Sequence, residues 1–219
     1  TPKQAMDMVP LMAGMYDEPF ADSSQLPTAL VCKLAHQQVT VALSGDGGDE
    51  LFCGYDRYPN TISIWNKLNK IPLPIRRTIA GILPFHYLSD GLTASTPDEL
   101  YFYLNTQWKG CPGLINGLSF KNKERIQMEK ILKDPMERFM YYDINKYLPD
   151  DILVKVDRAA MATSLETRVP LLDQDLIEYA WSLPMSIKYN NNITKWPLKQ
   201  LLYKYVPQSL LDRPKMGFG

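Results

Sequence analysis

The chain has 219 residues, 45% of them hydrophobic, so its length predicts one domain, or two at most, with a sizeable core. Its 24 Lys and Arg residues balance 24 Asp and Glu residues, which argues against nucleic acid or an anionic membrane as a partner. The chain has three Cys residues without CxxC spacing, which disfavours a disulfide framework, and only two His residues, which disfavours a histidine-rich metal cage. It has no apolar run long enough to span a bilayer. Together these features predict a cytoplasmic location.

The first third of the chain predicts a helix followed by a strand. Leu26, Leu30 and Leu34 recur four residues apart within residues 24–37, which is typical of an amphipathic helix. Residues 39–43 (VTVAL) form a short and nearly continuous apolar run. Such a run predicts a strand that is buried on both faces, as in a parallel sheet.

After the first third, the sequence predicts mainly helices. The expected helices cover residues 134–147, 152–165, 173–183 and 194–205. Met161 and Leu165 lie four residues apart on the second of them and are expected in the core. One clear strand cannot form a sheet, so we expect its other strands upstream of this chain or in segments with a weak strand pattern. The expected fold is therefore α/β, and mostly helical after the first third.

The loop SGDGGDE, residues 44–50, joins the predicted strand to the next helix. Doubly wound folds bind phosphates in loops of this kind, where glycines let the backbone approach the ligand. The carboxylates of Asp46, Asp49 and Glu50 would repel phosphate unless a divalent cation lay between them, and Mg²⁺ is often held by one or two carboxylates together with substrate phosphates. The alternative is a tight turn whose acidic residues only cap the following helix.

Four segments of the sequence resemble, in order, motifs of the glutamine-dependent asparagine synthetase family. They are DEPFADSS at residues 17–24, VALSGDGGDELFCGYDRY at 41–58, KVDRAAMATSLETRVPLLD at 155–173, and a closing segment between residues 194 and 218. The resemblance implies that residues 1–219 are the carboxyl-terminal part of an asparagine synthetase domain. Its implied fold is that of the ATP pyrophosphatases, which is of the adenine-nucleotide-hydrolase type and would be incomplete at its N-terminus here.

The resemblance also implies a ligase that uses ATP and Mg²⁺ to convert aspartate to asparagine. In the family, the substrate carboxylate attacks the α-phosphate of ATP, pyrophosphate leaves, and ammonia from glutamine displaces AMP from the β-aspartyl-AMP intermediate. The implied partners are small molecules and an upstream glutaminase domain, with neither nucleic acid nor a membrane among them. The sequence leaves the oligomeric state open, with a homodimer as one candidate.

Several residues of the loop match functional positions of the family. Asp46 matches the catalytic carboxylate that takes part in forming the adenylate and in receiving ammonia, where the common synthetases often carry Glu. The implied ATP-binding positions are Ser44, Gly45 and Gly47. Asp49, with Glu50 beside it, matches the position that holds Mg²⁺ on the pyrophosphate.

Other matching positions lie outside the loop. Lys215 matches the catalytic lysine of the family, whose ammonium can stabilise charge on the phosphate or on the tetrahedral intermediate. The implied substrate or phosphate contacts are Asp157, Arg158 and Arg213. Asp157 and Arg158 of the KVDR segment could instead form buried ion pairs with Glu166 and Arg168.

The sequence departs from the family in three respects. Cys53 stands where the family usually has Gly. The pyrophosphate loop SGGxDS and the glutaminase domain with its amino-terminal Cys are not found in the chain, so we expect a fragment that is inactive by itself. Two alternatives stay open: a related amide-forming enzyme, such as one that acts on sugars or peptides or a β-lactam synthetase (which has Tyr at the position of Asp46), and a non-catalytic interaction module.

Overall fold

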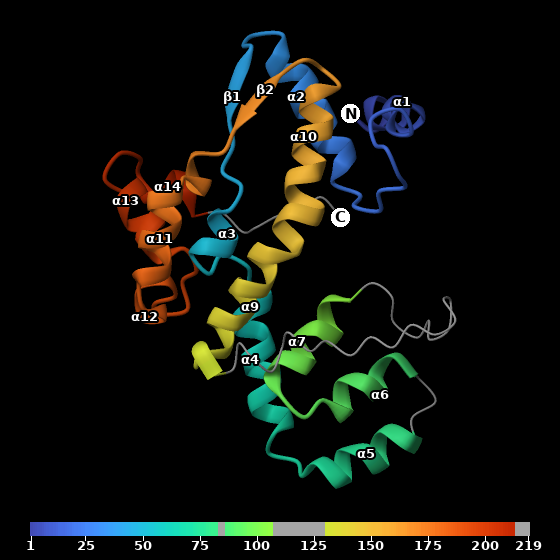
Figure 1. Cartoon of the computed structure of the whole chain (residues 1–219), viewed down its shortest axis with the longest axis vertical. Helices are drawn as coiled ribbons and strands as arrows, with labels where there is room; N and C mark the ends of the chain where they lie inside the picture. The colour runs from blue at the N-terminus through green and yellow to red at the C-terminus, as the bar shows by residue number, and fades with distance from the viewer. Residues whose placement is uncertain (83–85, 107–129, 213–219) are drawn as a thin grey trace. The chain divides into compact units, whose positions relative to one another are not determined.

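The computed structural model describes residues 1–82, 86–106 and 130–212 (Figure 1). The chain divides into two compact units, the first built from Thr1–Gly54 and Tyr142–Gly219 and the second from Tyr55–Tyr141. We expected one incomplete domain, and that prediction stays open. None of the helices in the described residues combines the length and the apolar composition needed to cross a membrane.

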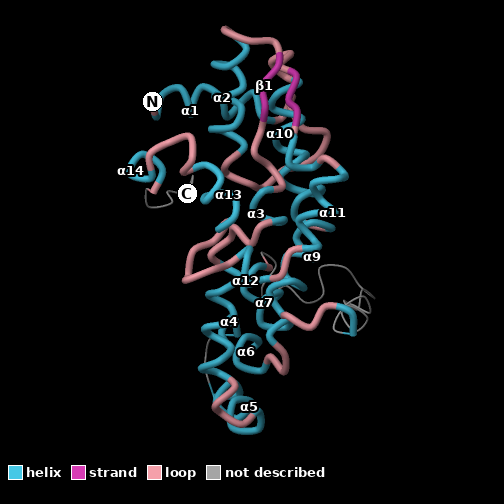
Figure 2. Tube along the Cα trace, turned by 90° about the vertical axis from the view of Figure 1, so that its left-hand side faces the viewer, coloured by secondary structure: helices cyan, strands magenta, loops and turns pink. Residues whose placement is uncertain are grey.

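The first unit contains the two strands of the described chain, β1 (Val41–Leu43) and β2 (Glu166–Arg168). They pair in parallel, with Val41 opposite Glu166 and Leu43 opposite Arg168, and Figure 2 shows them side by side. The predicted parallel sheet is thus confirmed, and its second strand is a polar ETR segment with a weak strand pattern. The predicted burial on both faces is wrong for the described residues, because the side chain of Leu43 is 74% exposed.

Helices make up most of the rest of the first unit. Those within the described residues are α1 (Pro2–Met12), α2 (Gln25–His36), α3 (Gly48–Leu51), the π-helical turn η1 (Leu148–Leu153), α10 (Val154–Met161), the 3-10 turn η2 (Pro170–Leu172), α11 (Gln174–Ser182), α12 (Met185–Lys188), α13 (Trp196–Leu202) and α14 (Gln208–Leu211). The helices predicted over 24–37 and 173–183 are therefore confirmed as α2 and α11. The helix predicted over 194–205 is confirmed as the shorter α13.

A core of mainly small side chains joins α2 to α10, which pack against each other. Its buried members are Met8, Ala29, Cys32, Ala159, Ala160 and Leu165. The buried stripe of α2 runs through Ala29 and Cys32, so that Leu34, the last leucine of the predicted amphipathic pattern, is 66% exposed. Met161 is also exposed, at 62%, because α10 ends there and Ser164, with φ +58°, turns the chain toward β2.

The second unit is helical within the described residues. It contains α4 (Arg57–Leu68), α5 (Leu73–Ile82), α6 (His86–Thr93), α7 (Pro97–Asn105) and most of α9 (Pro135–Asn145). The rings of Tyr101 and Phe139 stack in its core with centroids 4.2 Å apart. Beside them, the Arg138 guanidinium donates two hydrogen bonds, of 2.8 and 2.7 Å, to the Asp98 carboxylate. The helix predicted over 134–147 is confirmed as α9.

Candidate functional site

The loop of residues 44–50 begins where both strands end. The backbone N–H of Ser44 donates to the carbonyl oxygen of Arg168, the last residue of β2, over 2.8 Å. Since β1 and β2 are parallel, the loop lies at the carboxyl edge of the pair (Figure 2). That edge is where ligands bind in open α/β sheets.

The first residues of the loop present polar groups around an open stretch of backbone. The Ser44 hydroxyl donates a hydrogen bond to the Asp46 carboxylate, and both residues are half-buried. Gly45 between them is exposed, and a Cβ added there would meet nothing within 4 Å. The backbone at Gly45 is therefore open among the described residues, and the predicted roles of Ser44, Gly45 and Asp46 stay predictions.

The next two glycines are buried and make the turn into α3. Gly47 has φ +82°, a left-handed conformation that favours glycine, and an added Cβ would lie 3.0 Å from Leu172 Cγ. An added Cβ at Gly48 would lie 2.9 Å from Leu171 Cδ1. Packing against η2 therefore explains both glycines, and a contact between Gly47 and a nucleotide stays a prediction.

Asp49, at the start of α3, pairs with a lysine from a distant part of the chain. The Lys195 Nζ lies 2.8 Å from Asp49 Oδ2. Lys195 immediately precedes α13 with φ +54°, and its backbone N–H donates to the carbonyl oxygen of Phe52 over 3.2 Å. Gly54 lies against both side chains, so that an added Cβ would clash with Lys195 and with Asp49. Lys195 is thus built into the loop region, although the sequence marked it only as part of the closing segment.

The two candidate metal ligands differ in accessibility. Glu50 is 1% exposed, whereas Asp49 is half-buried and reaches the surface beside Lys195. No group of three or more His, Cys, Asp or Glu side chains within the described residues could hold a metal ion. Binding of Mg²⁺ by Asp49 together with substrate phosphates stays a prediction. The role of Glu50 as a ligand stays a prediction, and its burial makes Asp49 the better candidate.

The charged residues of the KVDR segment lie on α10. Arg158 pairs with Asp17, with 2.6 Å between Nη2 and Oδ2, and Asp157 is exposed. Glu166 pairs instead with Arg168 inside β2, where both side chains are exposed. The alternative that the KVDR charges form buried ion pairs with these two residues is therefore wrong. A contact of Asp157 or Arg158 with a substrate stays a prediction.

Lys155, one turn before Arg158, is the buried cation of this helix. Its side chain is 9% exposed, and its ammonium donates to the Asp22 carboxylate, with Asp151 at 3.9 Å. Asp22 also accepts hydrogen bonds from the backbone N–H and the hydroxyl of Ser24, over 2.8 and 2.7 Å. Burial by itself raises the pKa of Asp22, but the hydrogen bonds from Lys155 and Ser24 outweigh it and lower the pKa to about 2.

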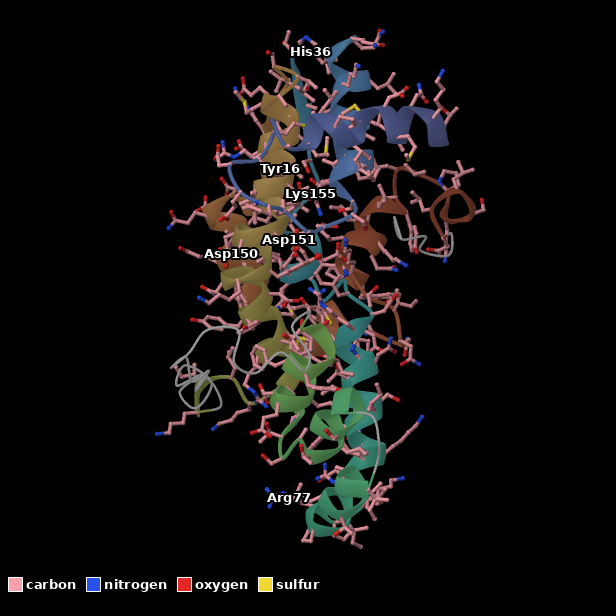
Figure 3. The ribbon with its side chains drawn as sticks, turned by 90° about the vertical axis from the view of Figure 1, so that its right-hand side faces the viewer. Tyr16, His36, Arg77, Asp150, Asp151 and Lys155 are labelled. Atoms are coloured by element: carbon pink, nitrogen blue, oxygen red, sulfur yellow. The ribbon has the colours of Figure 1, made fainter. Side chains whose placement is uncertain are left out.

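Tyr16 completes this polar cluster, and Figure 3 shows it near Lys155 and Asp151 beside α10. Its ring stacks on Phe20 with centroids 4.8 Å apart. The hydroxyl is buried without a hydrogen-bond partner among the described residues. Burial, and then the charge of Asp22, raises the pKa of Tyr16.

The remaining predicted positions are Arg213, Lys215 and Cys53. Arg213 and Lys215 lie outside the described residues. Cys53, which stands where the family usually has Gly, is buried with φ +54°, so the backbone conformation there is one that glycine adopts readily.

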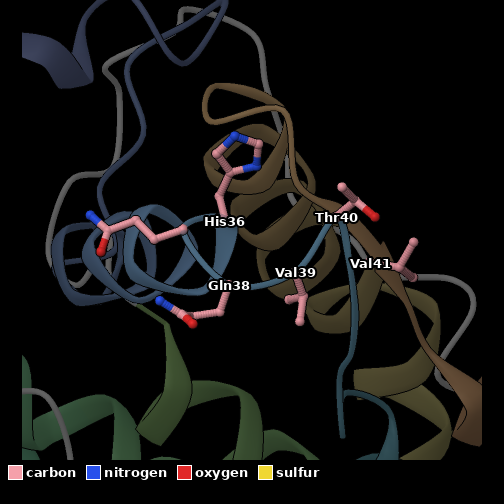
Figure 4. A pocket seen from close by; sticks show the side chains of 6 residues that line it. His36, Gln38, Val39, Thr40 and Val41 are labelled. Carbon is pink, nitrogen blue, oxygen red and sulfur yellow. The ribbon is translucent and has the colours of Figure 1, made fainter.

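An open hollow of about 520 Å³ lies at the turn between α2 and β1 (Figure 4). It is lined by residues 36–41, which lead into the amino end of β1. The loop of residues 44–50 follows the other end of the strand. The hollow is therefore separate from the candidate site.

The comparisons with known proteins agree with the motifs. The family model for asparagine synthase matches residues 1–219. The chain is 30% identical to asparagine synthetase [glutamine-hydrolyzing] 1 of Bacillus subtilis, over 100% of the chain and 36% of that protein. It is 33% identical to a putative asparagine synthetase [glutamine-hydrolyzing] of Mycobacterium bovis, over 96% of the chain and 34% of that protein.

A third relative is archaeal. The chain is 32% identical to the putative asparagine synthetase [glutamine-hydrolyzing] 2 of Methanocaldococcus jannaschii, over 72% of the chain and 32% of that protein. No solved structure matches the chain. The chain thus spans about a third of the length of these curated relatives. With the family model matching from end to end, the chain belongs to the asparagine synthase family.

Proposed function

We propose that the protein containing this chain forms an amide from a carboxylate at the expense of ATP, with aspartate as the carboxylate, asparagine as the product and glutamine as the source of ammonia. The family membership supports this chemistry, since the relatives are named asparagine synthetases. The observation that carries it is the loop of residues 44–50, which lies at the carboxyl edge of two parallel strands with Asp49 and Lys195 paired beside it.

The residues of the loop have distinct roles in this proposal. The exposed backbone at Gly45 and the hydroxyl of Ser44 bind the nucleotide. Asp46, oriented by the Ser44 hydroxyl, lies beside the reacting carboxyl group and takes part in forming β-aspartyl-AMP as pyrophosphate leaves. It then helps to receive the ammonia that attacks the acyl carbon and displaces AMP. Asp49 would hold Mg²⁺, which when bound neutralises charge on the phosphates of ATP.

Two lysines of the chain, Lys195 and Lys215, supply positive charge near the phosphates and the reacting centre. Lys195 already lies against Asp49 and reaches the same region as the loop, so it is placed to contact a phosphate oxygen once the nucleotide is bound. Lys215, by its match to the family motif, stabilises the charge that develops at the reacting centre. Neither residue needs to transfer a proton for this role, because a fixed ammonium stabilises the charge directly.

Residues 1–219 by themselves are proposed to be inactive. The SGGxDS loop, whose paired glycines expose backbone N–H groups to pyrophosphate in the family, is not found in this sequence. Measurable exchange between ATP and pyrophosphate by residues 1–219 alone would contradict this part of the proposal.

The test is an assay of the full-length protein with ATP, aspartate and either glutamine or ammonium. We expect ATP-dependent formation of asparagine and aspartate-dependent exchange of pyrophosphate into ATP. Asp46→Asn should lower both rates by about 100-fold or more, because it removes the carboxylate at the reacting centre. Asp46→Glu, which keeps the charge, should retain most of the activity.

Two results would contradict the proposed function. Full activity of Asp46→Asn would remove Asp46 from the reaction. An amide formed from another carboxylate but not from aspartate would assign a different substrate within the same reaction class, as in the sugar-modifying, peptide-modifying and β-lactam-forming alternatives.

A further inference from the structure

Two ion pairs join the segment of residues 17–24 to α10, and they differ in burial. Lys155 and Asp22 form the buried pair, in which Asp22 also accepts two hydrogen bonds from Ser24 at the start of α2. Arg158 and Asp17 form the exposed pair, in which the Asp17 side chain is 78% exposed. One buried ion pair and one exposed ion pair therefore connect the segment of residues 17–24 to α10.

The buried pair and the loop of residues 44–50 lie at the same end of the group formed by α2, α10, β1 and β2. α2 leads into β1 and α10 leads into β2, and Figure 1 shows that each strand runs back along the helix before it. The two strands pair in parallel, and the two helices pack against each other. The amino ends of both helices and the carboxyl ends of both strands therefore lie at one edge. Asp22 precedes the amino end of α2, and Lys155 lies in the first turn of α10.

The loop depends on how these two helix–strand units are aligned. Ser44 continues from β1, but its backbone N–H donates to Arg168 of β2. A shift of α2 along α10 would move Leu43 relative to Arg168 and so displace Ser44, the first residue of the loop. The register of the two helices thus sets the geometry of the candidate site.

The apolar contact between the helices does little to define that register. The fully buried side chains where they meet are small, and such side chains allow a close approach but interlock weakly. They are Ala29, Cys32, Ala159 and Ala160, and Leu26 and Leu30 of α2 pack against them only partly buried. A buried ammonium, in contrast, is stable only opposite its carboxylate, and a single buried polar contact can select one register among several.

We propose that Asp22 and Lys155 are positioning residues, which hold α2 and α10 in the register that places Ser44 and Asp46 for the reaction. The proposal rests on the proposed function, which assigns the loop to nucleotide binding and amide formation. Neither residue needs to touch the substrate. They act through the helices and strands that lead to the loop.

The test compares two matched variants of the full-length protein, Asp22→Asn and Asp17→Asn. Each replaces one aspartate of the 17–24 segment by its amide, the first in the buried pair and the second in the exposed pair. In Asp22→Asn we expect amide hydrogen exchange at residues 44–48 to be about tenfold faster, and kcat/KM for ATP to fall about 10- to 100-fold, since small displacements at a reacting centre have effects of this size. In Asp17→Asn both quantities should stay within about twofold of the wild type, as for an exposed pair.

A second comparison separates positioning from simple stabilisation. The double variant Asp22→Leu/Lys155→Met replaces the buried pair by apolar side chains, a change that often leaves stability unaltered. If the pair sets the register, the double variant should fold with near-wild-type stability and still show fast exchange at residues 44–48 and a low kcat/KM. Wild-type exchange and kinetics in a stable double variant would overturn the proposal.

Two further results would separate the role of the buried pair from the proposed function. Equal exchange at residues 44–48 in Asp22→Asn and Asp17→Asn would overturn the proposal, whether or not the protein makes an amide. Absence of amide formation by the wild type would contradict the proposed function, while the exchange comparison would still decide whether the pair holds the loop. If Asp22→Asn does not fold, Lys155→Arg takes its place, because it keeps the charge but changes its geometry, and it should give an intermediate exchange rate.

Discussion

The ammonium of Lys195 lies 2.8 Å from the carboxylate of Asp49, although the two residues are far apart in the sequence. Lys195 makes this contact from a left-handed backbone conformation, with φ +54° and ψ +32°, which costs a residue with a side chain about 1–2 kcal/mol. The hydrogen bond from its backbone N–H to Phe52 and the close approach of Gly54 hold it there. Strain at a residue that contacts a candidate metal ligand is typical of functional sites.

The variant Lys195→Gly should separate the functional role of Lys195 from its effect on stability. Glycine removes the strain of about 1–2 kcal/mol, and the loss of a partly exposed ion pair costs about 0–1 kcal/mol, so the free energy of unfolding should stay the same or rise by up to about 2 kcal/mol. Binding of ATP with Mg²⁺ should weaken about tenfold, because a cation near the phosphates is lost. Chemical denaturation and titration calorimetry of the full-length protein measure the two effects.

The matched control for that variant is Lys199→Met. Lys199 lies one turn further along α13 and pairs with Asp212 at 3.5 Å, with both side chains exposed. We expect its nucleotide affinity to equal that of the wild type. Equal affinities in Lys195→Gly and Lys199→Met would show that Lys195 does not contact the nucleotide.

The variant Gly54→Ala should destabilise the first unit. An added Cβ would lie 2.7 Å from the Cα of Asp49 and would also clash with the Lys195 side chain, and the backbone atom cannot move aside as a side chain would. Overpacking of this kind costs about 1–3 kcal/mol. Denaturant unfolding measures the change, with Gly81→Ala as the control.

The control variant is expected to have the opposite effect. Gly81 lies inside α5, and a Cβ there would meet nothing within 4 Å. Gly81→Ala should therefore stabilise the protein by about 0.5–1 kcal/mol, because alanine favours the helix and restricts the unfolded chain. A Gly54→Ala variant as stable as the wild type would show that the loop region tolerates the extra methyl group.

Acid should weaken the contact between Asp22 and Lys155. The pKa of Asp22 is lowered to about 2 from its ordinary value of 3.8, so the pair contributes its stability above about pH 4, and this contribution is lost as the pH falls toward 2. A shift of this size corresponds to about 2 kcal/mol, which partial exposure of the carboxylate reduces to about 1 kcal/mol. The free energy of unfolding of Asp22→Asn should therefore lie below that of the wild type at pH 6 by at least this amount, because the variant also leaves the buried Lys155 ammonium without its carboxylate, and the difference should narrow as the pH falls toward 2.

Measurements of unfolding across this pH range check the prediction, with Asp17→Asn as the control. That variant should follow the wild-type curve, since its aspartate belongs to an exposed pair. A difference between wild type and Asp22→Asn that stays constant from pH 6 to pH 2 would argue against a stabilising charge on Asp22.

The second unit should depend strongly on the pair between Arg138 and Asp98. Both side chains are 10% exposed, and two hydrogen bonds join them. Asp98→Ala leaves a buried guanidinium without its carboxylate, which costs about 3–5 kcal/mol. Glu166→Ala, which breaks an exposed pair in the first unit, should cost about 0–1 kcal/mol by the same denaturation measurement. Similar losses in the two variants would show that burial of the Arg138 pair is not decisive.

The local features of this protein could be read from its amino-acid sequence. Apolar spacing, caps and prolines predicted α2, α9 and α11, because a helix is stabilised by residues close to one another in the chain. The loop of residues 44–50 was visible for the same reason, since a glycine-rich turn after an apolar run is a local pattern. Four motifs in order were also enough to indicate the family.

The contacts between distant residues, in contrast, became visible with the folded chain. The polar segment ETR becomes β2 because it pairs with β1, and Lys195 joins the site because Asp49 and Phe52 hold it there. The burial of Lys155 against Asp22 and the exposure of Leu34 depend on which faces of α2 and α10 meet. These features arise from contacts between segments far apart in the chain, whose energies no pattern of neighbouring residues contains.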